Sequence, residues 1–184
     1  MQPLKNITEN IKQYAKSLSE DGFHQIFNHI DQFKIKEGVD RLGLDKFIDQ
    51  CAYLAAGSGV ISGSGGLFTM VIGMPLDFLN LISQQFRVTM AVMYHNRGTC
   101  HISFDEFMNM VAASLKVEAS VAITKTMMES VAEKMLMIFG TRTAERLIPV
   151  VGAAIGGTTN YIFIKRMAKM VKRMQLEPVV IMVN

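Results

Sequence analysis

The chain of 184 residues has the size of one domain, and it can bury a core large enough to fold without disulfides or metals. Hydrophobic residues make up 49% and charged residues 19%, a composition that excludes an intrinsically disordered chain. The net charge of +3 is too small to indicate nucleic-acid binding, so we expect one domain over residues 1–184 and no nucleic-acid partner.

Three amphipathic helices are predicted in the first part of the chain. In residues 6–18 the apolar side chains return to one helical face, and Gly22 is expected to end that helix. Spacing of i, i+3, i+4 and i+7 predicts a second helix over residues 23–33, ended by the polar residues 36–38. Asp45 can cap a third helix, because its carboxylate accepts the free amide protons of the first turn. That helix carries Phe47, Ile48, Cys51 and Leu54.

The next segment is apolar and rich in glycine. Residues 51–75 contain no charged side chain. Each interior glycine costs a helix about 1 kcal/mol relative to alanine, so either the helix breaks there or close packing compensates. Pro75 suits the first turn of a following helix over residues 76–96, which is apolar on nearly every side and has Arg87 in its middle. We expect this helix to be central and largely enclosed.

A capping box marks the start of the next helix. Ser103 and Glu106 can satisfy two free amide donors reciprocally, and one buried apolar stripe follows over residues 104–115. The helical spacing continues over residues 117–138, and Gly140 is expected to end the segment.

The last predicted helix has two unlike halves. Pro149 opens it, and residues 147–164 carry no charge, whereas residues 165–173 are strongly basic and keep one apolar face. The apolar tail, residues 178–184, is expected to lie in a groove between helices, with a short extended segment as the alternative.

These elements predict an all-α, single-domain helical bundle with a buried, Gly-rich central helix pair. Gly152 and Gly156 form a GxxxG arrangement that lets another backbone approach closely, and the glycines of residues 57–66 are its expected partner. The alternative is a pair of membrane spans, each of which needs about 20 apolar residues. The uncharged residues 147–164 fall short of that length and include the polar Asn160, so the bundle is preferred.

No motif in the chain indicates a reaction. The glycine-rich segment has no lysine for a phosphate-binding loop, and none of its serines has the Gly-x-Ser-x-Gly elbow of a hydrolase. His95, Cys100 and His101 match no common zinc spacing and are expected to be incidental residues of a turn. We expect no cofactor and no metal. An enzyme stays open as a class, but the sequence nominates no nucleophile or base.

The start of the chain and its cysteines predict where it resides. No signal peptide is visible, and Cys51 and Cys100 suit a reducing compartment, so we expect a cytoplasmic protein. Basic residues beside an apolar helix are the means by which a peripheral helix engages anionic lipid, here the inner membrane, and a solvated helix face is the alternative. The basic residues are Lys165, Arg166, Lys169, Lys172 and Arg173.

The chain resembles the EcsC family. The resemblance rests on residues 148–160, Ile-Pro-Val-Val-Gly-Ala-Ala-Ile-Gly-Gly-Thr-Thr-Asn, followed by an aromatic residue and a basic helix. It also rests on residues 74–77, Met-Pro-Leu-Asp, which lead an apolar helix with Arg87, and it covers about residues 47–173. The resemblance implies a bacterial, predominantly helical protein whose family namesake is encoded beside an ABC transporter. It implies no reaction, and this chain is shorter than typical members.

The function that the sequence favours is binding of a lipid or similar hydrophobic molecule in an apolar cavity or groove of the bundle. Arg87 and Asn160 are the polar side chains expected to hold a head group, although Arg87 can instead pair with an acid such as Asp77. The alternative is a structural or interaction protein, a homo-oligomer or a transporter partner, that uses exposed apolar surface. The predicted apolar wall consists of Phe78, Ile82, Phe86, Met90 and Met93 on the central helix, with Val151, Ile155 and Thr159 opposite.

Overall fold

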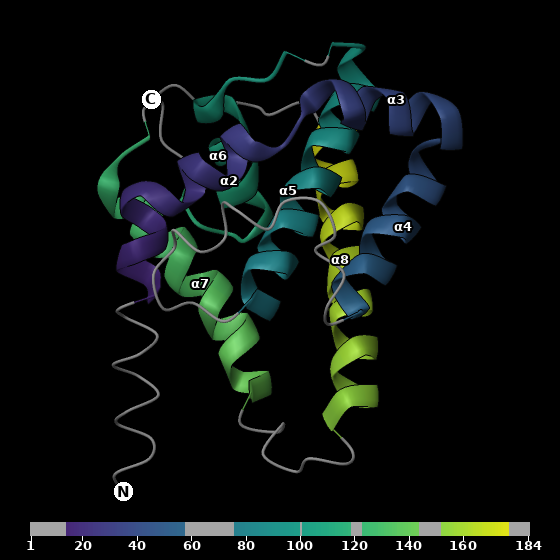
Figure 1. Cartoon of the computed structure of the whole chain (residues 1–184). Helices are drawn as coiled ribbons and strands as arrows, with labels where there is room; N and C mark the ends of the chain where they lie inside the picture. Colours follow the sequence, from purple (N-terminus) through teal and green to yellow (C-terminus); the bar gives the residue numbers. More distant parts are fainter. Residues whose placement is uncertain (1–13, 58–75, 100, 119–122, 144–151, 177–184) are drawn as a thin grey trace, which may run out of the picture.

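The computed structural model describes residues 14–57, 76–99, 101–118, 123–143 and 152–176. These residues form helices and their connections, with no strand among them, so the predicted all-α bundle is confirmed. One half of the molecule in Figure 1 holds α4 (Leu44–Ala56), α5 (Leu76–Arg97) and α8 (Gly152–Leu176). The other half holds η1 (Leu18–Gly22), α2 (Phe23–His29), α6 (Phe104–Ser114) and α7 (Lys125–Thr143), and α3 (Gln32–Leu42) lies across one end.

Helix α5 is the centre of the bundle. Helices α4 and α8 pack on it and on each other, and α3 and α6 cover further parts of its surface. Every side chain from Leu79 to Met93 is buried except that of Arg87, which is half-buried. A helix that is apolar on nearly all sides is stable only when other helices surround it, and the predicted central position is confirmed.

The N-terminal helices end at other places than the sequence predicts. Gly22 was expected to stop a helix, but its φ of −60° and ψ of −42° are helical, and the π-helical η1 passes directly into α2. Glycine weakens a helix without forbidding it, and the buried side chains of Leu18 and Phe23 hold the two parts in line. Helix α2 ends at His29, so the predicted end at residue 33 is also wrong.

Helix α3 begins close to where the sequence predicts a helix to end. The Asp31 carboxylate accepts hydrogen bonds from two backbone N–H groups of the first turn, at 3.0 and 3.2 Å, and so caps the helix. The predicted stop at residues 36–38 is wrong, because Gly38 is buried inside this helix. A Cβ on Gly38 would lie 2.5 Å from Cε2 of Phe47, so the absence of a side chain lets α3 approach α4 closely.

Helix α4 forms where it is predicted, but Asp45 is not its cap. Gly43 occupies the N-cap with φ +79°, a left-handed conformation that glycine adopts without steric cost. Asp45 lies in the first turn, where its charge still suits the positive end of the helix dipole. Its carboxylate accepts a hydrogen bond from Lys172 of α8 at 2.5 Å, and this tertiary ion pair takes the place of the cap.

Only half of the predicted capping box forms at the start of α6. The Ser103 Oγ accepts a hydrogen bond from the Glu106 backbone N–H at 3.3 Å, as predicted. The Glu106 carboxylate instead pairs with Arg97 at the end of α5, which ties the two helices together across the turn.

The helical pattern predicted over residues 104–138 belongs to two helices. Lys116 has φ +58°, so the helical path is broken after α6, and Thr124 then caps α7 by accepting from the Met127 N–H at 3.1 Å. Periodicity does not reveal the break, because apolar residues keep helical spacing on both sides of it. Helix α7 continues to Thr143, past the end predicted at Gly140.

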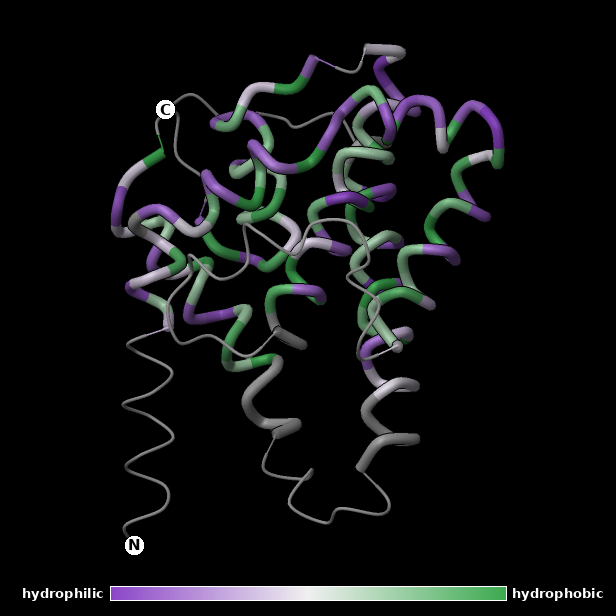
Figure 2. The backbone as a smooth tube through the Cα atoms, viewed as in Figure 1, coloured by the Kyte–Doolittle hydropathy of each residue, from purple (hydrophilic) through white to green (hydrophobic). Residues whose placement is uncertain are grey.

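Aromatic side chains join the two halves of the bundle. Figure 2 shows hydrophobic and hydrophilic residues alternating along the helices, as expected when each turns one face inward. The ring of Phe86 on α5 has centroid distances of 5.8 Å to Phe23 of α2 and 4.6 Å to Phe107 of α6. All three rings are fully buried, so this face of α5 is filled by the protein's own side chains.

Candidate functional site

The last carbonyls of α4 are capped by asparagines from the two neighbouring helices. Asn80 of α5 donates through Nδ2 to the Leu54 carbonyl at 2.9 Å, and Asn160 of α8 donates through Nδ2 to the Ala55 carbonyl at 3.0 Å. The final carbonyls of a helix have no partner within it, so these two side chains supply what the helix lacks. Asn160, which the sequence nominates for a head group, thus binds the backbone of α4.

Small residues let α4 and α8 approach closely at the same place. A Cβ on Gly157 would lie 3.1 Å from the Ala56 carbonyl oxygen, a backbone atom that cannot turn aside. The predicted close contact of the Gly-rich α8 therefore falls on the end of α4. The predicted contact itself, of Gly152 and Gly156 with the glycines beyond residue 57, lies outside what the structure describes.

Arg87 stands at the end of a chain of side-chain amides on one stripe of α5. Its Nη1 donates to Oε1 of Gln84 at 3.2 Å, and Nε2 of Gln84 donates to Oδ1 of Asn80 at 3.2 Å. Its guanidinium carbon lies 5.6 Å from the centroid of the Phe47 ring, and no carboxylate among the described residues pairs with it. Burial raises the pKa of the nearby Cys51 thiol to about 11, while the charge of Arg87 opposes that shift.

The structure places the predicted pocket residues in several environments. Ile82, Phe86, Met90 and Met93 are fully buried in the core, where Phe86 meets the rings of α2 and α6. Thr159 is half-buried on α8. Three predicted residues cannot be placed. Val151 lies outside the described residues, and the side chains of Phe78 and Ile155 are not described.

The basic part of α8 divides into paired and exposed cations. Lys165 donates to Asp49 of α4 at 2.5 Å, and Lys172 donates to Asp45 of α4 at the same distance. Their partners are positioned one turn apart on α4, so the two pairs join α4 to α8 along their length. The remaining three cations, Arg166, Lys169 and Arg173, are exposed.

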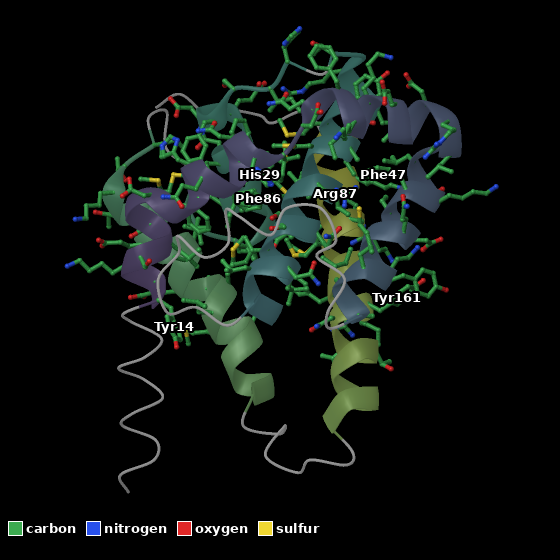
Figure 3. The ribbon with its side chains drawn as sticks, in the orientation of Figure 1. Tyr14, His29, Phe47, Phe86, Arg87 and Tyr161 are labelled. Atoms are coloured by element: carbon green, nitrogen blue, oxygen red, sulfur yellow. The ribbon has the colours of Figure 1, made fainter. Side chains whose placement is uncertain are left out.

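Exposed apolar and aromatic side chains accompany these cations. Tyr53 of α4 is 68% exposed, and its ring centroid lies 5.1 Å from that of Tyr161 of α8. Ile162, also on α8, is 42% exposed. Figure 3 shows Tyr161 on α8 close to α4. We call the surface formed by Tyr53, Tyr161, Ile162, Arg166, Lys169 and Arg173 the α4/α8 face.

The two ion pairs predict how stability depends on pH. Hydrogen bonds from Lys172 and Lys165 hold the pKa values of Asp45 and Asp49 below their ordinary values. Folding therefore gains stability from both groups above an ordinary aspartate pKa of about 4, and loses it as the pH falls below that value. We expect the urea midpoint of the wild type to fall in this acid range more steeply than that of the Asp45→Asn/Asp49→Asn variant.

A matched variant checks that prediction. Asp21→Asn/Glu133→Gln removes two exposed acidic groups that have no ion pair with α8 among the described residues. This control should keep the acid-dependent fall of the urea midpoint. The same fall in the wild type and in Asp45→Asn/Asp49→Asn would contradict the role given to the ion pairs.

Other classes of site are not seen among the described residues. No three histidines, cysteines or acids gather there to hold a metal ion. Over the same residues, no helix has the length and apolar character needed to cross a bilayer. No family model, no curated protein and no solved structure matches the chain. The resemblance to the EcsC family therefore stays a prediction.

Sequence reasoning missed the groups that surround Arg87 and the basic helix. Asn80, Gln84 and Arg87 have i, i+4, i+7 spacing, so a search for polar stripes on the apolar helix would have found them. Tyr53 had no such signal, because its place beside Tyr161 depends on how α4 packs against α8.

Proposed function

We propose that the protein binds the surface of an anionic membrane through the α4/α8 face. The observation that carries the proposal is the alignment of Arg166, Lys169 and Arg173 on the exposed side of α8, beside the exposed Ile162 and Tyr53. Basic side chains attract anionic lipid, and apolar and aromatic side chains enter the head-group region. This combination supports a peripheral protein at the cytoplasmic face of the inner membrane.

The charges near this face favour an anionic surface. Lys165 and Lys172 are already paired with aspartates, so attraction rests mainly on the other three cations, each contributing about 1 kcal/mol near anionic lipid. The function that the sequence favours, binding of a hydrophobic ligand in an enclosed cavity, receives less support, because Phe86 and its buried neighbours pack against other core residues. The proposal therefore places lipid at the surface.

Vesicle flotation tests the proposal. The wild type should float with phosphatidylcholine vesicles that contain phosphatidylglycerol, and should stay below with phosphatidylcholine alone. Arg166→Glu/Lys169→Glu/Arg173→Glu should lower the partition coefficient at least about 100-fold, because it removes roughly 3 kcal/mol of attraction and adds repulsion. Added salt should release the wild type, since exposed charges are screened.

The matched control makes the same change in net charge elsewhere. Lys16→Glu/Lys116→Glu/Lys134→Glu alters three exposed lysines outside the α4/α8 face and should keep most of the binding. Equal losses in both triple variants would show that net charge alone drives binding. A wild type that never floats with phosphatidylglycerol vesicles would end the proposal.

A further inference from the structure

A groove lies between α3, α4 and α5. Its volume is ≈ 780 Å³, and Figure 3 shows Arg87 and Phe47 close together beneath α3. The residues that line it are Lys34, Glu37, Gly38, Asp40, Arg41, Phe47, Gln50 and Arg87. The proposed membrane contact uses none of these residues.

The guanidinium of Arg87 is held in place on the wall of this groove. Gln84 accepts from its Nη1 at 3.2 Å, and Gln84 is itself fixed through Asn80 to the backbone of α4. A guanidinium has five N–H donors, and this bond uses one of them. The ring of Phe47 supports the group from one side, so the position of the charge is set before any ligand arrives.

Gly38 contributes to the same preorganised wall. Because it has no side chain, the backbone of α3 lies against the Phe47 ring, which is itself 2% exposed. The groove thus has a closely packed apolar wall beside a half-buried cation.

The other charges of the groove favour an anion. Arg41 is exposed, and Lys34 is exposed with Asp31 4.0 Å from its Nζ. Of the two acids that line the groove, Asp40 is engaged by an ion pair with Lys36 and by the Tyr94 hydroxyl at 2.7 Å. Glu37 is then the carboxylate that opposes Arg41, Arg87 and a Lys34 that is shared with Asp31.

We infer that this groove binds a phosphate group through Arg87, with Arg41 and Lys34 as further cationic contacts. The planar fork of a guanidinium matches two oxygens of a phosphate, and more than one cation suits a dianion. A free phosphate and the phosphate of a lipid head group present the same chemistry. This inference does not depend on the proposed membrane surface.

Isothermal titration calorimetry with inorganic phosphate and with a short-chain phosphatidic acid tests the inference. The wild type should bind at least one of them, and Arg87→Gln should weaken that binding at least about tenfold, the effect of losing a charge-assisted pair. The affinity of Arg87→Lys should lie between those of the wild type and Arg87→Gln, because lysine keeps the positive charge but lacks the planar guanidinium fork. Equal affinity for both probes identifies a free-phosphate site, and binding of the lipid alone identifies a head-group site.

Variants at two exposed positions test the inference even if Arg87→Gln does not fold. Arg41→Glu should weaken phosphate binding, whereas Lys134→Glu, which makes the same charge change on α7, should leave it unaltered. The inference fails if neither probe binds the wild type, or if Arg41→Glu and folded Arg87 variants bind as the wild type does. Arg87→Gln should still float with anionic vesicles, so failure here is distinct from failure of the membrane proposal.

Discussion

Phe86→Ala is expected to lower the free energy of unfolding by about 3–5 kcal/mol, the usual cost of removing a fully buried phenyl ring. The ring is 0% exposed and contacts the rings of Phe23 and Phe107, so its loss removes the ring contacts of α5 with both α2 and α6. Urea unfolding followed by circular dichroism measures the change. Phe86→Leu keeps most of the apolar volume, so its free energy of unfolding should fall less than that of Phe86→Ala.

Phe33→Ala is the control for this variant, because Phe33 is 60% exposed. Its removal should change the free energy of unfolding by about 1 kcal/mol or less. Comparing Phe86→Ala with Phe33→Ala also shows whether Phe86 is a packed core residue or lines a ligand pocket. If Phe86 lined a cavity for a hydrophobic ligand, as the sequence predicts, its removal would alter ligand uptake and cost little stability. Similar stabilities of Phe86→Ala and Phe33→Ala would contradict the packing described above.

Asn80→Leu/Asn160→Leu is expected to lower the free energy of unfolding by about 2–6 kcal/mol, because each change leaves one carbonyl of α4 without a partner at about 1–3 kcal/mol. Both side chains are 8% exposed, so little water is available to replace them. Leucine has the same number and branching of side-chain heavy atoms as asparagine and is somewhat larger, so the change leaves no cavity. Chemical denaturation of the two single variants and the double variant measures the effect.

Asn28→Leu serves as the surface control for the asparagine variants. Asn28 is exposed on α2, and the change should alter the free energy of unfolding by about 0.5 kcal/mol or less. Hydrogen exchange should also report faster exchange at the end of α4 in the double variant, because its carbonyl caps hold that end to α5 and α8. Unchanged exchange there, together with unchanged stability, would show that the caps do not hold the helix.

The fold class and most of the helices could be predicted from the amino-acid pattern alone. Helical spacing and the Ser103 cap predicted α6, and the nearly all-round apolar surface of residues 76–96 predicted that α5 lies at the centre. These features are local, because each depends on residues within a few turns of one another. For the same reason the sequence nominated Arg87, the one charge in the middle of an apolar helix.

The places where helices join, end and pair depend on tertiary contacts and could not be predicted from local patterns. Gly22 lies inside a helix, Asp45 pairs with Lys172 in place of capping, and Asn160 binds the backbone of α4. Each of these outcomes depends on residues far apart in the chain, whose contacts outweigh a local preference of about 1 kcal/mol. The grouping of Arg87 with α3 and α4, and of Tyr53 with Tyr161, arises in the same way, because spacing along one helix does not specify its neighbour.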